Sequence, residues 1–219
     1  MHNTVKNLIY IEDLIKSRVN DWNIDKIPKI IAVSKTFPLE HIIPLIEHNH
    51  LDYGENKVQE ALDKWSDIKV KNKKIKLHLI GKLQSNKVKS AVKIFDYIHS
   101  VDSDKLAAKI ADEQNKQNKK LKIFIQINIG NEDQKSGIDK TNVLNFYKYC
   151  KSLNLDVIGT MCLPPRDDNS KNYFSEMTKI NKELNLSDLS MGMSQDYLEA
   201  VKNNATFLRI GSKIFGERN

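Results

Sequence analysis

The chain reads Lys29-Ile30-Ile31-Ala32-Val33-Ser34-Lys35-Thr36-Phe37-Pro38 at its first strongly apolar run, which opens into a loop at a lysine. A short β-branched run of this kind, bounded by loop residues, is typical of a buried strand in a parallel sheet. Similar apolar runs recur along the chain, and helical stretches separate them. The eight candidate strands begin near Lys29, Leu51, Leu77, Tyr97, Leu121, Leu155, Asp188 and Phe207.

Strands that alternate with helices predict an α/β fold with a parallel sheet. Eight such units match a small (β/α)8 TIM barrel. The competing architecture is an open doubly wound sheet, which has about five or six strands. No Gly-x-Gly-x-x-Gly follows the first strand, and the number of repeats favours closure. We therefore expect a closed barrel.

The expected organisation is one domain over residues 1–219, because no low-complexity linker or change of composition divides the chain. We expect residues 1–28 to form an N-terminal helix (3–22) and the segment that leads into the barrel. Residues 29–219 are expected to form the barrel itself. The lysine-rich run 69–76 is expected to be a solvated loop. The active site of such a barrel lies at the carboxyl ends of its strands.

Composition excludes several classes of protein. The 219 residues are 40% hydrophobic and 29% charged, and no apolar run approaches the roughly 20 residues of a membrane span. The N-terminus lacks the apolar core of a signal peptide. Cys150 and Cys162 follow no metal-ligand spacing, so we expect no metal site and a cytoplasmic location.

The net charge of +7 raises the question of nucleic-acid binding. Only four of the 35 basic residues are arginines, although base readout favours arginine. The lysines are spread along the whole chain and mixed with many asparagines. We therefore expect no nucleic-acid partner.

Lys35 is the first candidate for chemistry. It stands where a buried strand opens into a loop, so its ammonium is partly desolvated, which lowers the pKa and favours the nucleophilic amine. A lysine in such a place is the usual group for holding an aldehyde as a Schiff base. The alternative is an ordinary loop charge.

The seventh and eighth strands end in small and hydroxyl residues. Ser190-Met191-Gly192-Met193-Ser194 ends strand seven, and Arg209-Ile210-Gly211-Ser212 ends strand eight. Glycines and serines there are typical of the phosphate site of barrel enzymes. The alternative is that they are helix caps and turns.

Strands one, seven and eight become neighbours when the barrel closes. A molecule with an aldehyde at one end and a phosphate at the other would bridge Lys35 and the phosphate site, and pyridoxal 5′-phosphate (PLP) has that shape. Arg209 would then lie near the pyridine nitrogen and disfavour its protonation, unless it forms a structural salt bridge instead. Asn56, at the end of strand two, faces the cofactor or forms a turn.

Several longer segments of the chain are distinctive. They are Ala32-Val33-Ser34-Lys35, Tyr53-Gly54-Glu55-Asn56-Lys57-Val58-Gln59-Glu60, His78-Leu79-Ile80-Gly81 with Leu83-Gln84-Ser85-Asn86-Lys87, Gln126-Ile127-Asn128 with Lys135-Ser136-Gly137, Leu189-Ser190-Met191-Gly192-Met193-Ser194, and Arg209-Ile210-Gly211-Ser212 with Ile214-Phe215-Gly216. In these segments, over residues 31 to 218, the chain resembles the pyridoxal-phosphate homeostasis proteins. The departures are Ser212, where the family more often has threonine, Thr160, where it usually has leucine, and Lys82, which does not follow the family pattern.

The resemblance implies a PLP barrel of fold type III, like the N-terminal domain of alanine racemase. It implies a Schiff base on Lys35, with Arg209 directed toward the ring. It also implies phosphate contacts from Ser190, Ser194, Gly211 and Ser212.

Because the sequence ends at Asn219, we expect no second domain of the kind that gives such racemases their dimer contacts and catalytic tyrosine. A two-base racemase needs an acid or base on each face of the substrate, and only Lys35 can be named. We therefore expect no catalytic residue, and a monomeric carrier or regulator of PLP whose candidate partners are apo forms of PLP-dependent enzymes. The alternatives are a small PLP-dependent racemase or decarboxylase, and a partner-binding module without a cofactor. Two residues in the site region remain to be placed: His78 is expected to be a hydrogen-bonded core residue, and Glu55 to pair with a lysine.

Overall fold

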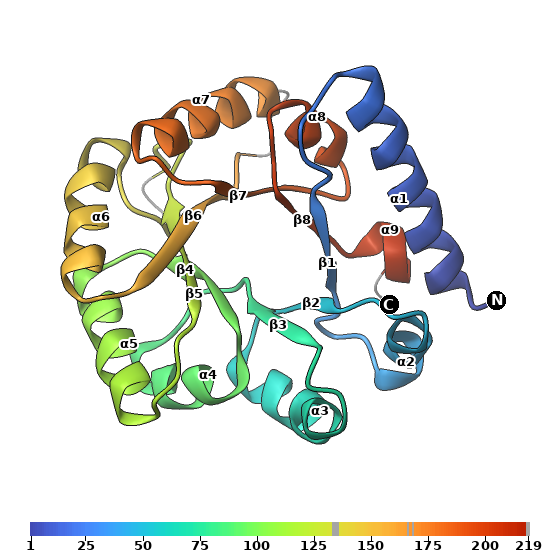
Figure 1. Cartoon of the computed structure of the whole chain (residues 1–219), viewed down its shortest axis with the longest axis horizontal. Helices are drawn as coiled ribbons and strands as arrows, with labels where there is room; N and C mark the ends of the chain where they lie inside the picture. The colour runs from blue at the N-terminus through green and yellow to red at the C-terminus, as the bar shows by residue number, and fades with distance from the viewer. Residues whose placement is uncertain (133–135, 166, 168, 218–219) are drawn as a thin grey trace.

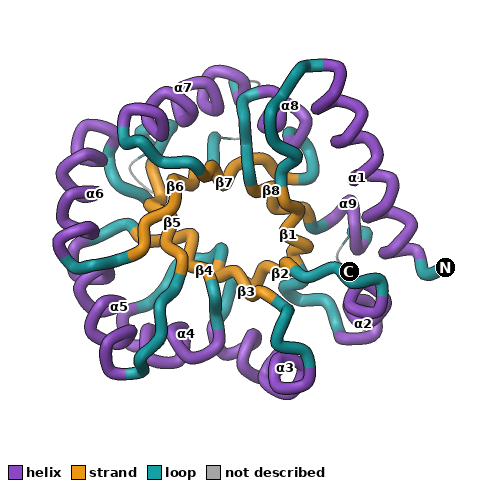
Figure 2. Tube along the Cα trace, viewed as in Figure 1, coloured by secondary structure: helices purple, strands orange, loops and turns teal. Residues whose placement is uncertain are grey.

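The structure is a computed structural model that describes residues 1–132, 136–165, 167 and 169–217. Its parallel strands close into a barrel in chain order, from β1 beside β2 round to β8 beside β1. Helices surround the barrel (Figures 1 and 2). The (β/α)8 prediction is confirmed, and the open doubly wound sheet is excluded. Lys135 of the family motif lies outside the described residues.

The strands are β1 (Lys29–Val33), β2 (Asp52–Glu55), β3 (Lys76–Leu79), β4 (Tyr97–Val101), β5 (Lys122–Ile127), β6 (Asp156–Cys162), β7 (Asp188–Met193) and β8 (Phe207–Ile210). The helices are α1 (Asn3–Asp21), α2 (Leu39–Glu47), α3 (Val58–Lys71), α4 (Val88–Ile94), α5 (Asp104–Lys116), α6 (Val143–Ser152), α7 (Ser170–Glu183), α8 (Tyr197–Lys202) and α9 (Ser212–Phe215), with 3-10 turns η1 (Ser85–Lys87) and η2 (Lys140–Asn142). Each strand starts within one residue of its predicted position.

The N-terminal helix is confirmed and packs on the outside of the barrel. It lies against α2, α8 and α9 (Figure 1). Its buried face repeats at helical spacing through Leu8, Ile11 and Ile15. The Asn7 amide also donates to the Ile214 carbonyl oxygen at 3.0 Å, which ties α1 to the last helix of the chain.

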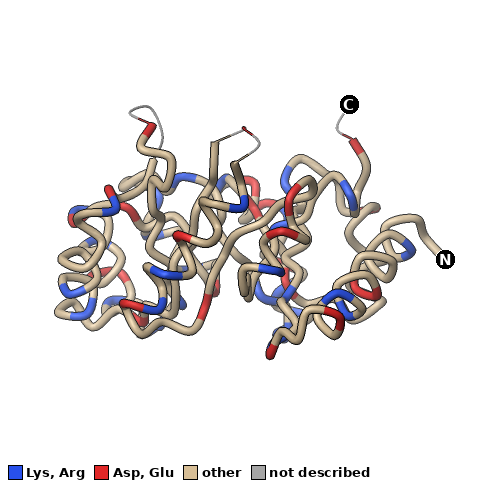
Figure 3. Tube along the Cα trace, turned by 90° about the horizontal axis from the view of Figure 1, so that it is seen from above, with Lys and Arg blue, Asp and Glu red and all other residues tan. Residues whose placement is uncertain are grey.

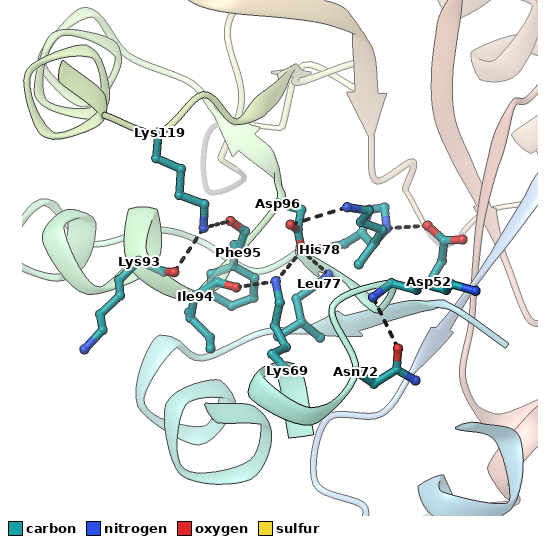
Figure 4. A network of polar contacts seen from close by, with 12 residues as sticks. Asp52, Lys69, Asn72, Leu77, His78, Lys93, Ile94, Phe95, Asp96 and Lys119 are labelled. Carbon is teal, nitrogen blue, oxygen red and sulfur yellow. Dashed lines mark hydrogen bonds and ion pairs between the residues drawn. The ribbon is translucent and has the colours of Figure 1, made fainter. Parts of the chain in front are cut away.

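The prediction of a solvated loop over 69–76 was wrong for its first part. Helix α3 continues to Lys71, and the Lys69 ammonium binds the Asp96 carboxylate and the Ile94 carbonyl oxygen (Figure 4). A lysine that can reach a partly buried carboxylate from the last turn of a helix stabilises that turn. A run of lysines in the sequence does not reveal such a partner.

The wall of the barrel between β6 and β7 depends on two small residues. A Cβ at Gly159 would lie 1.9 Å from the Asp188 carbonyl oxygen, so only glycine fits between these strands. Thr160 is buried and donates its hydroxyl to the Asn181 side chain of α7 at 3.0 Å. The departure from leucine at this position therefore changes the packing of strand on helix.

Charged residues of both signs are spread around the barrel (Figure 3). In the part of the chain that the structure describes, no helix has the length and apolar character needed to cross a bilayer.

Candidate functional site

Three of the predicted site residues follow strands that are neighbours in the barrel. In the register of β1, Ala32 pairs with Ile210 of β8 and Val33 pairs with Gly54 of β2. Lys35, Gly211 and Asn56 come shortly after these paired residues, at the carboxyl ends of β1, β8 and β2. The closure of the barrel therefore brings the first and last strands of the sequence together at one edge.

The turn that carries Lys35 is held on both sides. Lys35 itself is half-buried. On one side, the Lys64 ammonium donates to the Ser34 carbonyl oxygen at 2.9 Å. On the other, the Thr36 amide donates to the Glu60 carboxylate, and Thr36 has a φ of 67°, in the left-handed region. A β-branched residue rarely adopts this conformation, so the two contacts from α3 oppose a backbone strain beside the lysine.

A buried carboxylate lies behind this turn. The Glu55 side chain is fully buried, and its Oε1 accepts from Ser34 Oγ at 2.8 Å, Trp65 Nε1 at 3.0 Å and Lys64 Nζ at 3.0 Å. Its Oε2 is buried without a hydrogen-bond partner. Burial raises the pKa of Glu55, and these donors only partly oppose the shift. The expected pairing of Glu55 with a lysine is confirmed.

The turn after β7 lies against the turn after β8. The half-buried Ser194 Oγ accepts from the Gly211 amide at 3.3 Å and from the Lys213 amide at 3.4 Å. Gly211 lies beside β1, because a Cβ there would make van der Waals contact with Val33 Cβ at 3.4 Å. Ser212 is exposed at the first position of α9. The structure thus brings Ser194, Gly211 and Ser212 together near the Lys35 strand.

Arg209 is buried within the barrel, with 3% of its surface exposed. Its guanidinium donates to Ser190 Oγ at 2.7 Å and to the Cys162 carbonyl oxygen at 2.8 Å. Burial lowers the pKa of Arg209, although nearby Cys162 and Asp196 oppose the shift. Both of these acceptors, the Ser190 hydroxyl and the Cys162 carbonyl oxygen, are uncharged, and neither is a carboxylate.

Ser190 and Asn56 are placed differently from the Ser194 group. Ser190 is fully buried, and its hydroxyl contacts Arg209 and His99 inside the barrel. Asn56 is half-buried after β2, and its backbone lies against Gly81, where a Cβ would come within 2.5 Å of the Asn56 carbonyl oxygen. Close packing of that backbone fixes the point at which the Asn56 side chain leaves the main chain.

Sequence reasoning missed three polar residues of this region. Glu60 and Lys64 lie four residues apart on α3, and that spacing alone indicates an ion pair, whose distance is 3.1 Å. His99 is buried and lies two residues after Tyr97 on β4, so the two side chains share the inward face of the strand. His78 is confirmed as a hydrogen-bonded core histidine.

A cavity of about 370 Å³ opens at the other end of the barrel. It is lined by residues of α1, by the start of β1 and by the turn before β2, including Lys29, His50 and Asp52. Because these residues begin the strands, the cavity lies opposite the strand ends that carry Lys35.

Comparisons with known proteins agree with this geometry. A family profile described as "Alanine racemase, N-terminal domain" matches residues 18–219. The pyridoxal phosphate homeostasis protein of Pasteurella multocida is 36% identical over 202 residues, which cover 87% of each chain.

Among solved structures, PipY of Synechococcus elongatus PCC7942, with PLP bound, is 31% identical and superposes with a TM-score of 0.81 over 92% of this chain and 100% of its own. An alanine racemase of Clostridium difficile is 16% identical, with a TM-score of 0.71 over 99% of this chain and 57% of its own, and shares the fold.

Proposed function

The chain belongs to the pyridoxal phosphate homeostasis family, and we propose that it holds PLP as a Schiff base on Lys35 and acts in PLP homeostasis as a carrier or regulator. The observation that carries the proposal is the meeting of the Lys35 turn with the Ser194–Gly211 contact at neighbouring strand ends. The PLP-bound structure of a relative at 31% identity supports it.

The phosphate end of the cofactor fits the turns after β7 and β8. The amides of Gly211 and Lys213 reach Ser194 Oγ at 3.3 and 3.4 Å, which is long for N–H···O bonds. A phosphate oxygen is a stronger acceptor for these amides than a hydroxyl. The Ser194 and Ser212 hydroxyls would then donate to the same phosphate.

The aldehyde end fits the Lys35 turn. When bound, PLP supplies an aldehyde that condenses with an amine, forming a C=N bond with loss of water. The contacts of Lys64 with Ser34 and of Glu60 with Thr36 keep the backbone of Lys35 at the edge of the barrel. They place the amine before the cofactor arrives, which lowers the entropic cost of binding.

The remaining predicted residues serve the ring. With PLP bound, Arg209 would direct a positive charge toward the pyridine nitrogen, which would disfavour its protonation and make the pyridine ring a poorer electron sink. Asn56 offers its amide from the end of β2. A direct phosphate contact from Ser190 would require its hydroxyl to leave His99 or Arg209, so we assign Ser190 to the site through Arg209.

We propose a carrier rather than an enzyme because the relatives at 33–36% identity are named for homeostasis and because Arg209 weakens carbanion stabilisation. Apo forms of PLP-dependent enzymes are the proposed recipients, and the proposed form is a cytoplasmic monomer. The buried thiols of Cys150 and Cys162 support a reducing compartment.

Absorbance spectroscopy of the protein mixed with PLP tests the assignment of Lys35. The wild type should develop the visible band of a Schiff base, and Lys35→Ala should lack it. Lys57→Ala, which removes an exposed lysine after the next strand, should keep it. An unchanged band in Lys35→Ala would sink the proposal. A screen for turnover of amino acids, with Lys35→Ala as control, tests the carrier role, and Lys35-dependent racemisation or decarboxylation would contradict it.

A further inference from the structure

A chain of buried hydrogen bonds crosses the interior of the barrel and ends at Arg209. Arg209 Nη1 donates to Ser190 Oγ at 2.7 Å, and Ser190 Oγ lies 2.8 Å from His99 Nδ1. His99 Nε2 lies 3.0 Å from His78 Nδ1, and His78 Nε2 lies 3.0 Å from Asp52 Oδ1. Figure 4 shows the last of these contacts. These hydrogen bonds join residues of five strands, from β8 through β7, β4 and β3 to β2.

The two ends of this hydrogen-bonded network, Asp52 and Arg209, face different surroundings. Ser190, His78 and His99 are fully buried. The Asp52 side chain is 19% exposed and lines the cavity at the amino ends of the strands. Arg209 lies at the end that carries the proposed cofactor site. The network therefore links the partly solvated Asp52 carboxylate to the buried Arg209 guanidinium. The three side chains between them are out of reach of water.

Chemistry allows the hydrogen bonds of this chain only one direction while both histidines are neutral. A guanidinium can only donate and a carboxylate can only accept. His78 must therefore carry its proton on Nε2, which leaves Nδ1 to accept from His99 Nε2. His99 Nδ1 then accepts the Ser190 proton, and Ser190 accepts from Arg209. Every donor points toward Asp52.

The charges of the groups agree with this direction. Burial lowers the pKa of His78 and, more strongly, that of His99, where the charges of His78 and Arg209 add to the effect. Burial pushes the pKa of Asp52 upward, but the bond from His78 and the nearby basic groups, Lys29 among them, together outweigh burial and leave the pKa below its ordinary value. The histidines are thus neutral and the carboxylate is ionised near pH 7.

Aromatic packing holds both imidazoles in place. His78 stacks on Tyr97, with centroids 4.2 Å apart and planes 13° from parallel. His99 stacks on Phe124 at 4.2 Å and 18°. Phe207 contacts both imidazoles and Phe124 from β8. The stacking fixes the planes of both rings. A ring flipped by 180° within its plane would place carbon atoms where its nitrogens now meet their partners, so the hydrogen bonds select the observed orientation.

We propose that Asp52, His78 and His99 are positioning residues for Arg209: through Ser190 they fix the direction in which its guanidinium meets the cofactor. The role toward the cofactor rests on the proposed PLP function, whereas the direction of the chain does not. The bonds of such a network polarise one another, so a change at Asp52 is transmitted to Arg209.

Nitrogen-15 NMR of the imidazole side chains, recorded on the protein without PLP, tests the direction. Both His78 and His99 should show a protonated Nε2 and an unprotonated Nδ1 near pH 7. A protonated Nδ1 or an imidazolium at either residue would overturn the proposal. This measurement needs no variant and no cofactor, so it stands apart from the test of Lys35.

Binding of PLP to variants tests the positioning role. His99→Phe keeps a ring on Phe124 but breaks the chain, so the Kd for PLP should rise about tenfold, the effect of about one hydrogen bond, and the Schiff-base band should move. Asp52→Asn keeps an acceptor for His78 without the charge, so it should move the band with a smaller change in Kd. Tyr97→Phe, beside the chain but not in it, should leave both unchanged.

These outcomes separate the two proposals. An unchanged Kd and band in His99→Phe, in a protein whose wild type binds PLP, would refute the positioning role alone. A wild type without any Schiff-base band would refute the proposed function, and with it the role of the chain toward the cofactor.

Discussion

Replacing Lys64 by methionine removes the ammonium that joins three groups behind the Lys35 turn. Its Nζ lies 3.0 Å from Glu55, 3.1 Å from Glu60 and 2.9 Å from the Ser34 carbonyl oxygen, and the side chain is 11% exposed. Methionine has a similar length and no charge. The variant therefore leaves the fully buried Glu55 carboxylate with only Ser34 and Trp65 as hydrogen-bond donors.

Removing one partner of a buried ion pair costs about 3–5 kcal/mol. Because two donors to Glu55 remain, we expect the lower end, about 3 kcal/mol, or a fall in Tm of roughly 6–12 °C for a chain of this size.

The cost should depend on pH. Burial already raises the pKa of Glu55, and the loss of Lys64 raises it further. A carboxyl whose folded pKa lies above its unfolded value stabilises the fold below the unfolded value, and that contribution is lost as pH rises through the folded pKa. The penalty in Lys64→Met should therefore be small near pH 5 and largest near pH 8.

Urea unfolding at both pH values measures the penalty. Lys122→Met is the matched control, because its pair with Asp156 is 2.7 Å long but about half exposed, and such pairs contribute less than about 1 kcal/mol. The reasoning would be refuted if Lys64→Met cost no more than Lys122→Met, or if its cost did not change with pH.

Three further predictions concern backbone strain, strand packing and the phosphate site. Thr36→Gly should stabilise the protein by about 0.5–1 kcal/mol in urea unfolding, because glycine adopts a positive φ freely, whereas Thr36→Ala should give no such gain. Gly159→Ala should destabilise it by about 3 kcal/mol or more, since its Cβ would clash with the Asp188 carbonyl; a loss under 1 kcal/mol by the same method would contradict this packing. Ser194→Ala should weaken PLP binding about tenfold in a titration while Ser194→Thr retains most of it, and equal affinities in all three proteins would remove Ser194 from the phosphate site.

The fold was predictable because each strand can be recognised from its own local sequence. An apolar run such as 29–33, followed by a helical stretch, needs no knowledge of distant residues, and counting eight repeats favoured a closed barrel over an open sheet. The end of α3 was harder to predict. Its last turn depends on Asp96, which lies 27 residues beyond Lys69 in the chain.

The polar residues around the site were likewise predictable only where the local sequence marks them. Lys35 and the glycine-serine turns were found from their places at strand ends. The hydrogen-bonded network between Asp52 and Arg209 was not predicted, because its members lie on five strands. No spacing in the sequence relates His99 to Ser190. Only closure of the barrel brings them into contact. The family resemblance implied a phosphate contact from Ser190, and its hydrogen bond to Arg209 leads us to propose a role through that guanidinium instead.

The central claim is that one lysine among 31 carries the cofactor. Reduction of the PLP-loaded protein with borohydride makes a Schiff base permanent, and mass spectrometry of its peptides then locates the modified residue. We predict one pyridoxyl group per chain, on Lys35. Modification of a different lysine, or a scatter over many lysines with none dominant, would contradict it.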